Sequence, residues 1–410
     1  MSITNLYQPS AKACIYDGVW WTALSDKKDE TNFKYIFDVF DADGNQLIRS
    51  KVYPDPATGR GYFDVSGVLR SAVNLNWGGF FSPLQFYYQV FNNTNHLKVE
   101  YSVQVGEEYN VGASGITYLN EASGQTFAFN SINDMWTKGN DYKFAPTATA
   151  GVTEPYGYVT NRPFQVKSQY ANEPIIIGVH LKYVASPANY YNKFTIKKYN
   201  AAGTLLGTAE EIYDLNPGDD VYLLVNIGVE GINNIATGFI DSNVAYYTIQ
   251  CVKDVIRVDL DCNGMYEMYN LIFLNRLGMY DTARFACVNK MSMDVQRKIF
   301  EKRDVSFGNT GVSYKLGSSQ YNETKINYDG VINWNLKLTM DFPTDQEYQW
   351  LSELIYSTKV ILAKNINGTT YFYPVVIKNS NYEYIQRLSS KLKTLEIDVD
   401  LSQKRNQMRR

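Results

Sequence analysis

The residues that most often carry catalysis and metal binding are scarce in this sequence. Only two histidines and four cysteines occur among its 410 residues. These side chains are the usual acid–base groups, nucleophiles and metal ligands. The cysteines form no Cys-x-x-Cys pair, so neither a zinc site nor a redox motif is indicated. We therefore predict a protein with no enzymatic activity, no cofactor and no metal ion, whose cysteines are buried free thiols.

A strong net charge and long apolar runs are also lacking. The formal net charge is −3, which gives no general attraction to nucleic acid or to an anionic membrane. No apolar run approaches the roughly 18 residues that a membrane-spanning helix needs. The first residues, Met1-Ser-Ile-Thr-Asn5, lack the basic and apolar regions of a signal peptide. The sequence thus predicts a protein made in the cytoplasm, with no nucleic acid and no membrane as partners.

The patterns that come closest to functional motifs each lack a required part. Asp259-Leu-Asp-Cys-Asn-Gly264 matches the first half of a calcium loop, but the twelfth position is Asn270 where a bidentate glutamate is needed. His96 lies in a polar turn and His180 among apolar strand residues, and neither is near a Gly-x-Ser-x-Gly pattern. Pairs of acidic residues occur, but the spacing across a cleft that a glycosidase requires cannot be read from a sequence. A glycosidase is the least favoured of the functions considered.

Tyrosine, in contrast, is abundant. The chain has 34 tyrosines, and aromatic residues make up 15% of it. Tyrosine combines a large apolar ring with one polar atom, which suits half-buried strand faces and protein contacts. Aromatic pairs of this kind can also stack on sugar rings. The candidates for subunit or glycan contact are Trp20, Trp21, Tyr190 and Tyr191.

Strand patterns dominate the chain, and two short helices interrupt them. Phe33–Phe40 and Gln46–Tyr53 are predicted to form a hairpin around an Asp-Gly turn, and Leu97–Val105 alternates apolar and polar residues. Residues 65–74 follow helical spacing, and Asp64 is placed to cap that helix. Thr344-Asp-Gln-Glu347 is a capping box that predicts a second helix over 345–356.

Composition and turn spacing divide the sequence into three β domains. The stretch from Ala145 to Pro155, rich in threonine, alanine and proline, is the candidate linker. We therefore predict an N-terminal β domain over 1–150, a β-sandwich-like domain over 151–262, a β domain over 263–402 and a basic tail over 403–410. The predicted fold class is mainly β, with tandem β-sandwich-like domains, one short helix in the first domain and one in the C-terminal domain.

Two segments resemble a known family. Leu271-Ile-Phe-Leu-Asn-Arg-Leu-Gly-Met-Tyr-Asp-Thr-Ala-Arg-Phe285 is similar to a segment of structural proteins of tailed bacteriophages that infect Bacteroidetes-type bacteria. The stretch from Phe33 to Asp64 is similar to a second segment of the same proteins. Met279 departs from the pattern, which usually has a second glycine there. The resemblance implies a component of the virion, in the tail or the head–tail region, and supplies no catalytic residues.

The first of these segments has a physical interpretation of its own. Leu271–Leu274 is predicted to be a strand, and Asn275 and Gly278 tolerate the left-handed backbone of a turn. Arg276 and Asp281 are placed to hold that turn as an ion pair. Arg284 and Phe285 are predicted to begin the return strand.

The leading interpretation is a structural virion protein that forms a ring or another symmetric oligomer. Its partners would be further copies of itself and other virion proteins, and it would be assembled in the host cytoplasm and located in the virion. Edge strands and tyrosine-rich faces would make the contacts. The alternative is a β-sandwich protein of the phage tail or of a host surface that binds a carbohydrate or a receptor, with a host glycan as ligand.

Overall fold

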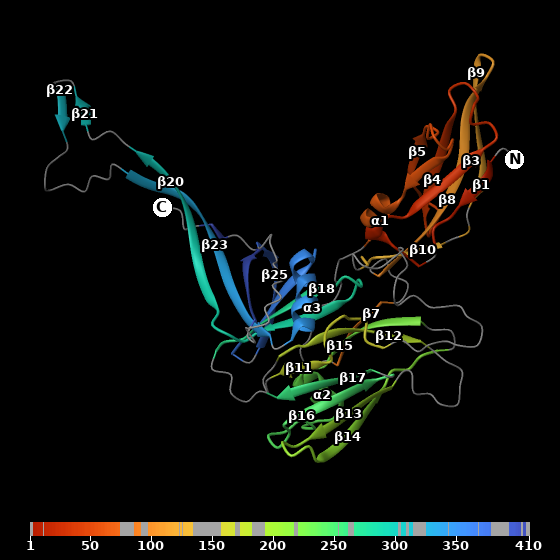
Figure 1. Cartoon of the computed structure of the whole chain (residues 1–410). Helices are drawn as coiled ribbons and strands as arrows, with labels where there is room; N and C mark the ends of the chain where they lie inside the picture. Colours follow the sequence, from red (N-terminus) through yellow and green to blue (C-terminus); the bar gives the residue numbers. More distant parts are fainter. Residues whose placement is uncertain are drawn as a thin grey trace. The chain divides into compact units, whose positions relative to one another are not determined.

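The computed structural model is mainly β, as the sequence predicts, with three short α-helices among the described residues (Figure 1). By contacts the chain divides into two compact units, Met1–Cys262 with Phe273–Thr282, and Asn263–Ile272 with Ala283–Arg410. The three-domain division stays a prediction. The structure describes residues 3–10, 12–73, 86–91, 97–122, 124, 126–133, 157–168, 173–182, 193–216, 220–252, 254–260, 266–301, 305–308, 311–314, 325–342, 344–367, 369–378, 393–402 and 405–406.

Two sheets at the start of the first unit enclose one core. One core cluster takes buried residues from both sheets, such as Trp21 and Ala23 from the smaller and Phe37 and Val103 from the larger, which is the arrangement of a β-sandwich. The smaller sheet has the order β1-β3-β6, with strands Ile3–Tyr7, Trp20–Ser25 and Gly61–Asp64. The larger has the order β2-β10-β8-β4-β5, with β9 also on β8, and its strands are Ala13–Cys14, Thr126–Phe129, Lys98–Val111, Lys34–Asp41, Gln46–Val52 and Ser114–Ala122.

The rest of the first unit has a second core between two further groups of strands. A five-stranded sheet has the order β11-β17-β16-β13-β14, with strands Gln165–Ser168, Asp254–Leu260, Tyr246–Cys251, Lys193–Tyr199 and Leu205–Ile212. The facing group has the order β19-β12-β15-β7, with strands Tyr280–Phe285, Ile176–Lys182, Asp220–Asn226 and Tyr87–Phe91. Buried residues of both, such as Phe194, Ile249, Val179 and Leu223, form one cluster.

A helix that the sequence analysis did not predict packs into this second core. Helix α2 covers Val229–Ile235, and its Val229 and Ile232 are buried in the cluster. One glycine and two asparagines in seven residues give the segment a low helix propensity. The helical conformation of this segment is therefore stabilised by the burial of its apolar residues and not by its helix propensity.

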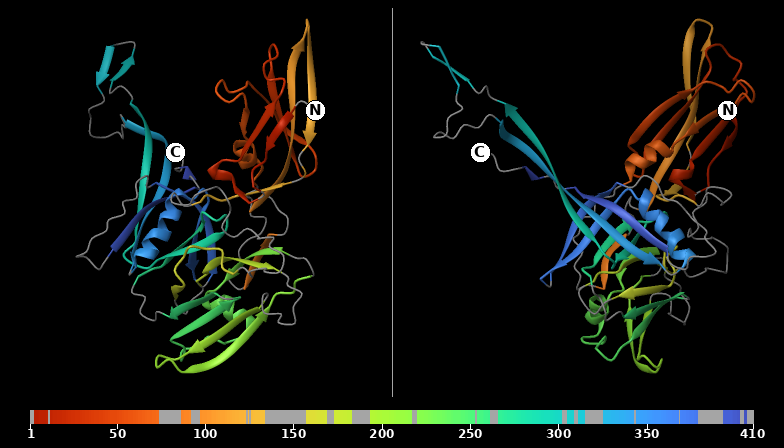
Figure 2. Two further views of the ribbon diagram at one scale, coloured as in Figure 1. Left: turned by 45° about the vertical axis from the view of Figure 1, so that its right-hand side comes forward. Right: turned by 60° about the vertical axis from the view of Figure 1, so that its left-hand side comes forward.

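The second unit contains the longest strand among the described residues, β23. Its sheet has the order β20-β23-β26-β25-β24-β18, and β18 (Tyr269–Leu274) and β19 each run across the boundary between the units. The other strands of this unit are Lys290–Glu301 (β20), Val305–Gly308 (β21), Gly311–Tyr314 (β22), Lys325–Phe342 (β23), Val360–Ile366 (β24), Thr369–Ile377 (β25), Lys393–Leu401 (β26) and Arg405–Asn406 (β27). Figure 2 shows β20 and β23 continuing as a narrow ribbon within this unit.

Helix α3 (Asp345–Tyr356) has the bounds that the sequence predicts. The backbone N–H of Glu347 donates to Thr344 Oγ1 at 3.2 Å, which confirms Thr344 as the predicted N-cap, and the Thr344 hydroxyl donates to Glu347 Oε2 at 3.3 Å. The helix buries its own residues Trp350, Leu351 and Leu354 on one face. The local signal was sufficient here because the cap and the apolar face agree.

Helix α1 (Ser66–Ala72) also forms, within the predicted range of 65–74. Asp64 takes part in its start but is not the cap residue, which is Val65. Asp64 Oδ1 accepts from the backbone N–H groups of Ser66 at 3.0 Å and of Val19 at 2.9 Å. The aspartate therefore joins the helix start to the strand region before β3.

Candidate functional site

The turn between β18 and β19 is fixed by a buried asparagine. Asn275 Oδ1 accepts from the backbone N–H groups of Leu277 and Met279, each at 3.0 Å. Its Nδ2 donates to Val159 O at 3.0 Å and to Asp281 Oδ2 at 3.2 Å. Because Asn275 is 3% exposed, these bonds replace water at a buried polar group. The side chain of Asn275 thus sets both the turn and its contact with the segment around Val159.

Glycine is required at one position of this turn. Gly278 has φ +81°, in the left-handed region. A Cβ atom there would lie 2.3 Å from Asn130 O and 2.7 Å from Leu97 Cδ1. The backbone N–H of Ile132 donates to Arg276 O at 2.9 Å, so the turn also bonds to the segment that follows β10. The expectation for Gly278 is confirmed in its backbone conformation, whereas Asn275 does not have a positive φ.

Hydrogen bonds anchor the side chains of Asp281 and Arg276 to a neighbouring segment of the first unit. Asp281 is fully buried, and its Oδ2 accepts from Thr160 Oγ1 at 2.6 Å as well as from Asn275. Arg276 Nη2 donates to Asn161 Oδ1 at 3.2 Å, and the ion pair of Arg276 with Asp281 stays a prediction. The return strand begins at Tyr280, four residues earlier than predicted at Arg284. The turn of residues 275–281 is therefore a packing element of the first unit.

The two adjacent tryptophans have opposite environments. Trp21 is fully buried, and its ring lies edge-on to Tyr101 with 6.5 Å between the ring centroids. The expectation that Trp21 contacts a partner or a glycan is wrong, because alternation along β3 turns it into the core. Trp20 is 50% exposed and stays a candidate contact residue. Tyr190 and Tyr191 lie outside the described residues.

Trp20 belongs to a row of exposed aromatic residues on the outer face of the smaller sheet. Thr22 pairs with Tyr7 of β1 on one side and with Tyr62 of β6 on the other, so all three side chains lie on one face. Trp20 is two residues before Thr22 and shares that face. Tyr7 is 58% and Tyr62 37% exposed, and the Tyr62 hydroxyl lies 3.1 Å from Thr58 Oγ1. The sequence alone did not group these residues, because strand pairing brings them together.

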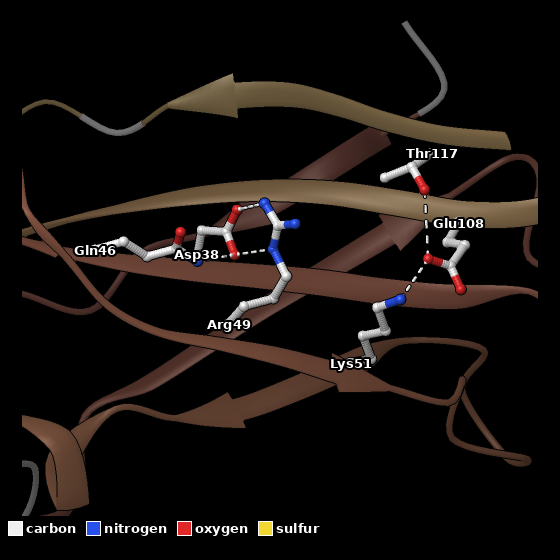
Figure 3. Close-up of polar contacts among 6 residues, drawn as sticks. All are labelled: Asp38, Gln46, Arg49, Lys51, Glu108 and Thr117. Atoms are coloured by element: carbon white, nitrogen blue, oxygen red, sulfur yellow. Dashed lines mark hydrogen bonds and ion pairs between the residues drawn. The ribbon is translucent and has the colours of Figure 1, made fainter.

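Charged residues cover the outer face of the larger sheet, from β5 to β9 (Figure 3). Arg49 donates to both carboxylate oxygens of Asp38, at 2.7 and 2.6 Å, and Gln46 adds a bond of 3.0 Å. The hydrogen bond with Asp38 raises the pKa of the Arg49 guanidinium. Lys51 bonds to Glu108 Oε2 at 2.6 Å, which lowers the pKa of Glu108. Asp38 is buried beneath this cluster, whereas Glu108 is partly exposed.

The β20–β23 ribbon, defined as β20 with residues 325–337 of β23, exposes several apolar side chains. Met291 and Met293 are 51% and 52% exposed, and Ile299 is 56% exposed. Only Val295 of β20 is half-buried. Registration places Met293 opposite Trp334 and Val295 opposite Ile332 on the same face. The ribbon therefore carries an apolar face that no core of its own unit covers, among the described residues.

No catalytic or metal-binding group stands out in the part of the chain that the structure describes. It contains no set of three or more His, Cys, Asp or Glu side chains that could hold a metal ion. Asp259 of the partial calcium pattern bonds to Gln165 and Arg257, each at 2.7 Å, and residues 261–265 of that pattern lie outside the described ranges. His180 is fully buried and stacks on Tyr222 with 4.1 Å between the ring centroids, whereas His96 is outside the described ranges.

The cysteines of the described residues are buried or half-buried. Cys14 and Cys251 are buried free thiols, as expected, Cys287 is half-buried, and Cys262 lies outside the described residues. Burial raises the pKa of the Cys251 thiol, which makes it a poor nucleophile. Among the described residues, no helix has the length and apolar character needed to span a membrane.

The sequence matches no protein-family model and no curated protein. The resemblance to phage structural proteins thus rests on the two segments quoted above.

Proposed function

We propose that this chain is a structural protein of a tailed phage particle that assembles as a symmetric oligomer in the tail or the head–tail region. The observation that carries the proposal is the apolar face of the β20–β23 ribbon, where Met291, Met293 and Ile299 are each about half exposed. An exposed apolar face on a long strand pair is typical of a protein contact surface. The resemblance of residues 271–285 to phage structural proteins supplies the setting.

The charge and the chemistry of the described residues agree with this proposal. The formal net charge of −3 leaves no general attraction to nucleic acid. The polar clusters of the described residues join neighbouring strands, as Arg49 with Asp38 and Asn275 with Asp281 do. A protein that acts by contact needs a rigid scaffold of this kind and no reacting group.

Two measurements test the proposed function together. Antibodies against the chain should label purified phage particles from the cells that express it, and mass spectrometry of those particles should detect it in several copies. Native mass spectrometry of the isolated protein should give one symmetric oligomer. Monomers alone at high concentration, together with absence from the particles, would contradict the proposal.

A second function, carbohydrate binding, is favoured by the aromatic row of Tyr7, Trp20 and Tyr62. The three side chains lie on one exposed sheet face, and aromatic faces of this kind stack on sugar rings. Trp20→Ala should then abolish binding on a glycan array. The matched control is Tyr328→Ala, which removes a 54% exposed tyrosine of the ribbon and should leave glycan binding unchanged. No binding by the unmodified chain would exclude this alternative.

A further inference from the structure

The outer edge of β20 is open along its whole length in the described part of the chain. β20 pairs with β23 over Lys290–Glu301, and among the described residues no other strand pairs with it. Every second residue of β20 therefore directs its backbone N–H and C=O away from the sheet. Open edges of this length readily add a strand from another chain. A two-stranded ribbon is also only marginally stable in water without further strands or cover.

β20 carries both charged and apolar side chains. Lys290, Asp294, Arg297, Lys298 and Glu301 are charged, and charges on an edge strand oppose pairing with another chain unless opposite charges meet. Met291, Met293, Val295 and Ile299 share one face of the strand with Arg297. A partner strand must therefore place opposite charges across the ladder.

We propose that β20 pairs with β20 of a second copy of this chain, antiparallel and centred on Gln296. The inference deepens the proposed function and rests on the self-assembly that it assumes, because it names the surface and the partner. A two-fold contact of this kind needs only one surface, since each copy presents the same edge to the other. The sequence of β20 favours one register over the alternatives.

The geometry of an antiparallel pair limits the registers. Residues directly opposite one another in an antiparallel pair carry their side chains on the same face of the sheet. The two-fold axis must therefore lie midway between one residue and the same residue of the other copy. Centres at Asp294, Arg297 or Lys298 place identical charges directly opposite, which is destabilising. Centres closer to either end pair fewer residues. The remaining centres are Val295 and Gln296.

Charge contacts select Gln296. With the axis there, Asp294 of each copy lies opposite Lys298 of the other, and Met293 lies opposite Ile299, so both contacts occur twice. With the axis at Val295, Met291 faces Ile299 and Val295 faces its own counterpart, but Asp294 faces Gln296 and Lys298 faces Ser292, so no opposite charges meet. Opposite charges and apolar pairs directly across a ladder each stabilise it by about 0.2–1 kcal/mol. Lys298 already bonds to Asp329 at 3.0 Å, so it would join two carboxylates of different copies.

The apolar faces of the two ribbons would become continuous in this register. A two-fold axis perpendicular to the sheet keeps each face on its own side, so Met293 and Ile299 of both copies gather on the face that carries Trp334 and Ile332. The lateral contacts reduce the exposure of side chains that are about half exposed in the single chain.

Disulfide crosslinking of the full chain tests the register. Gln296→Cys should crosslink to itself under mild oxidation, because the residue faces its own counterpart. Asp294→Cys alone and Lys298→Cys alone should not crosslink, since the two copies of each lie several residues apart, but a mixture of these two variants should give a crosslinked heterodimer. The unmodified chain gives the background from its native cysteines.

A charge reversal gives a second, independent measurement. Asp294→Lys should weaken self-association about tenfold, since two attractive contacts become repulsive. Asp43→Lys is the matched control, because it makes the same change at an exposed turn residue between β4 and β5 and should leave self-association unchanged. Circular dichroism spectra confirm that both variants fold.

The outcomes separate this inference from the proposed function. Failure of Gln296→Cys to crosslink in a chain that still forms oligomers overturns the β20 contact and leaves the virion role standing. Self-crosslinking of Val295→Cys or Arg297→Cys in place of Gln296→Cys overturns the register. Crosslinking of Gln296→Cys in a protein absent from phage particles supports the contact and contradicts the virion role.

Discussion

The turn of residues 275–281 and the β20–β23 ribbon differ in how their side chains are covered. In the turn, Asn275 and Asp281 are 3% and 0% exposed, and each is hydrogen bonded to other parts of the first unit. In the ribbon, apolar side chains of β20 are exposed, and its outer edge has no strand partner among the described residues. The first region is complete within one chain, whereas the second has the features of a contact surface. The alternation of apolar and polar residues in a sequence does not show whether the apolar face of a strand is buried in its own chain or exposed for contact with another chain.

The largest stability effect should come from the buried member of the tryptophan pair. Trp21→Ala empties a fully buried site and removes the edge-on contact with Tyr101, so it should lower the free energy of unfolding by about 3–5 kcal/mol. Trp20→Ala, at a half-exposed site, should change it by less than about 0.5 kcal/mol. Urea denaturation measures both. Equal effects would contradict the assigned orientations.

The buried turn should be the next most sensitive region. Asn275→Ala leaves two backbone N–H groups and Val159 O without their partner and should cost about 2–4 kcal/mol. Arg276→Ala, in the same turn, removes one half-buried hydrogen bond and should cost about 1 kcal/mol or less. Thermal unfolding of the two variants provides the comparison. A larger loss for Arg276→Ala would support the ion-pair interpretation.

The two ion pairs of Figure 3 should differ because one carboxylate is buried and the other is not. Arg49→Met leaves the Asp38 side chain, which is 1% exposed, without its bidentate partner and should lower the stability more than Lys51→Met does. Lys51→Met leaves Glu108 at 24% exposure and should cost about 0–1 kcal/mol. Chemical denaturation of each variant checks the ratio, and similar costs would mean that burial of Asp38 has no influence.

A smaller effect with a defined pH dependence is expected at Lys364 in the second unit. Its amine lies 3.0 Å from Glu267 Oε1 and 3.2 Å from the Tyr269 hydroxyl. Burial alone would raise the pKa of Glu267, but hydrogen bonds from Lys364 and Tyr269 together lower it. Burial alone would lower the pKa of Lys364, but the same partners together raise it.

The two shifts set the pH limits of this contribution. A lowered carboxyl pKa stabilises the fold above its unfolded value near 4.5, and that contribution is lost as the pH falls through the folded value. A raised amine pKa stabilises the fold below 10.5, and that contribution is lost as the pH rises through the folded value. Lys364→Met should therefore cost up to about 1 kcal/mol at pH 7 and less at pH 3. A cost that is independent of pH would contradict the ion pair.

The ribbon should show the smallest change in stability and the largest change in assembly. The double variant Met293→Ser with Ile299→Ser replaces two exposed side chains and should alter the free energy of unfolding by less than about 0.5 kcal/mol. The same variant should weaken self-association, which analytical ultracentrifugation measures. A substantial loss of stability without a change in association would mean that these residues serve the core of a single chain.

Local sequence signals predicted the elements that depend on neighbouring residues. The capping box at Thr344 and the apolar spacing after it gave helix α3 at its observed bounds, and the Asp-Gly turn gave the β4–β5 hairpin. Helix α2 was missed because its propensity is low, and its burial in the second core depends on strands distant in sequence. The return strand was predicted to start late because its buried polar residues, such as Asp281 and Thr282, do not resemble a core strand.

The sequence by itself determined the mainly β fold class, the two predicted helices and the small number of residues suited to catalysis, because these depend on composition and on patterns within a few residues. Only the tertiary structure decided which face of each strand is covered. It placed Trp21 in the core and left Trp20 exposed, it gave Asn275 and Asp281 their buried partners, and it left the apolar residues of β20 uncovered. Alternation sends neighbouring side chains to opposite faces, but only pairing and packing between distant segments determine which face meets a core.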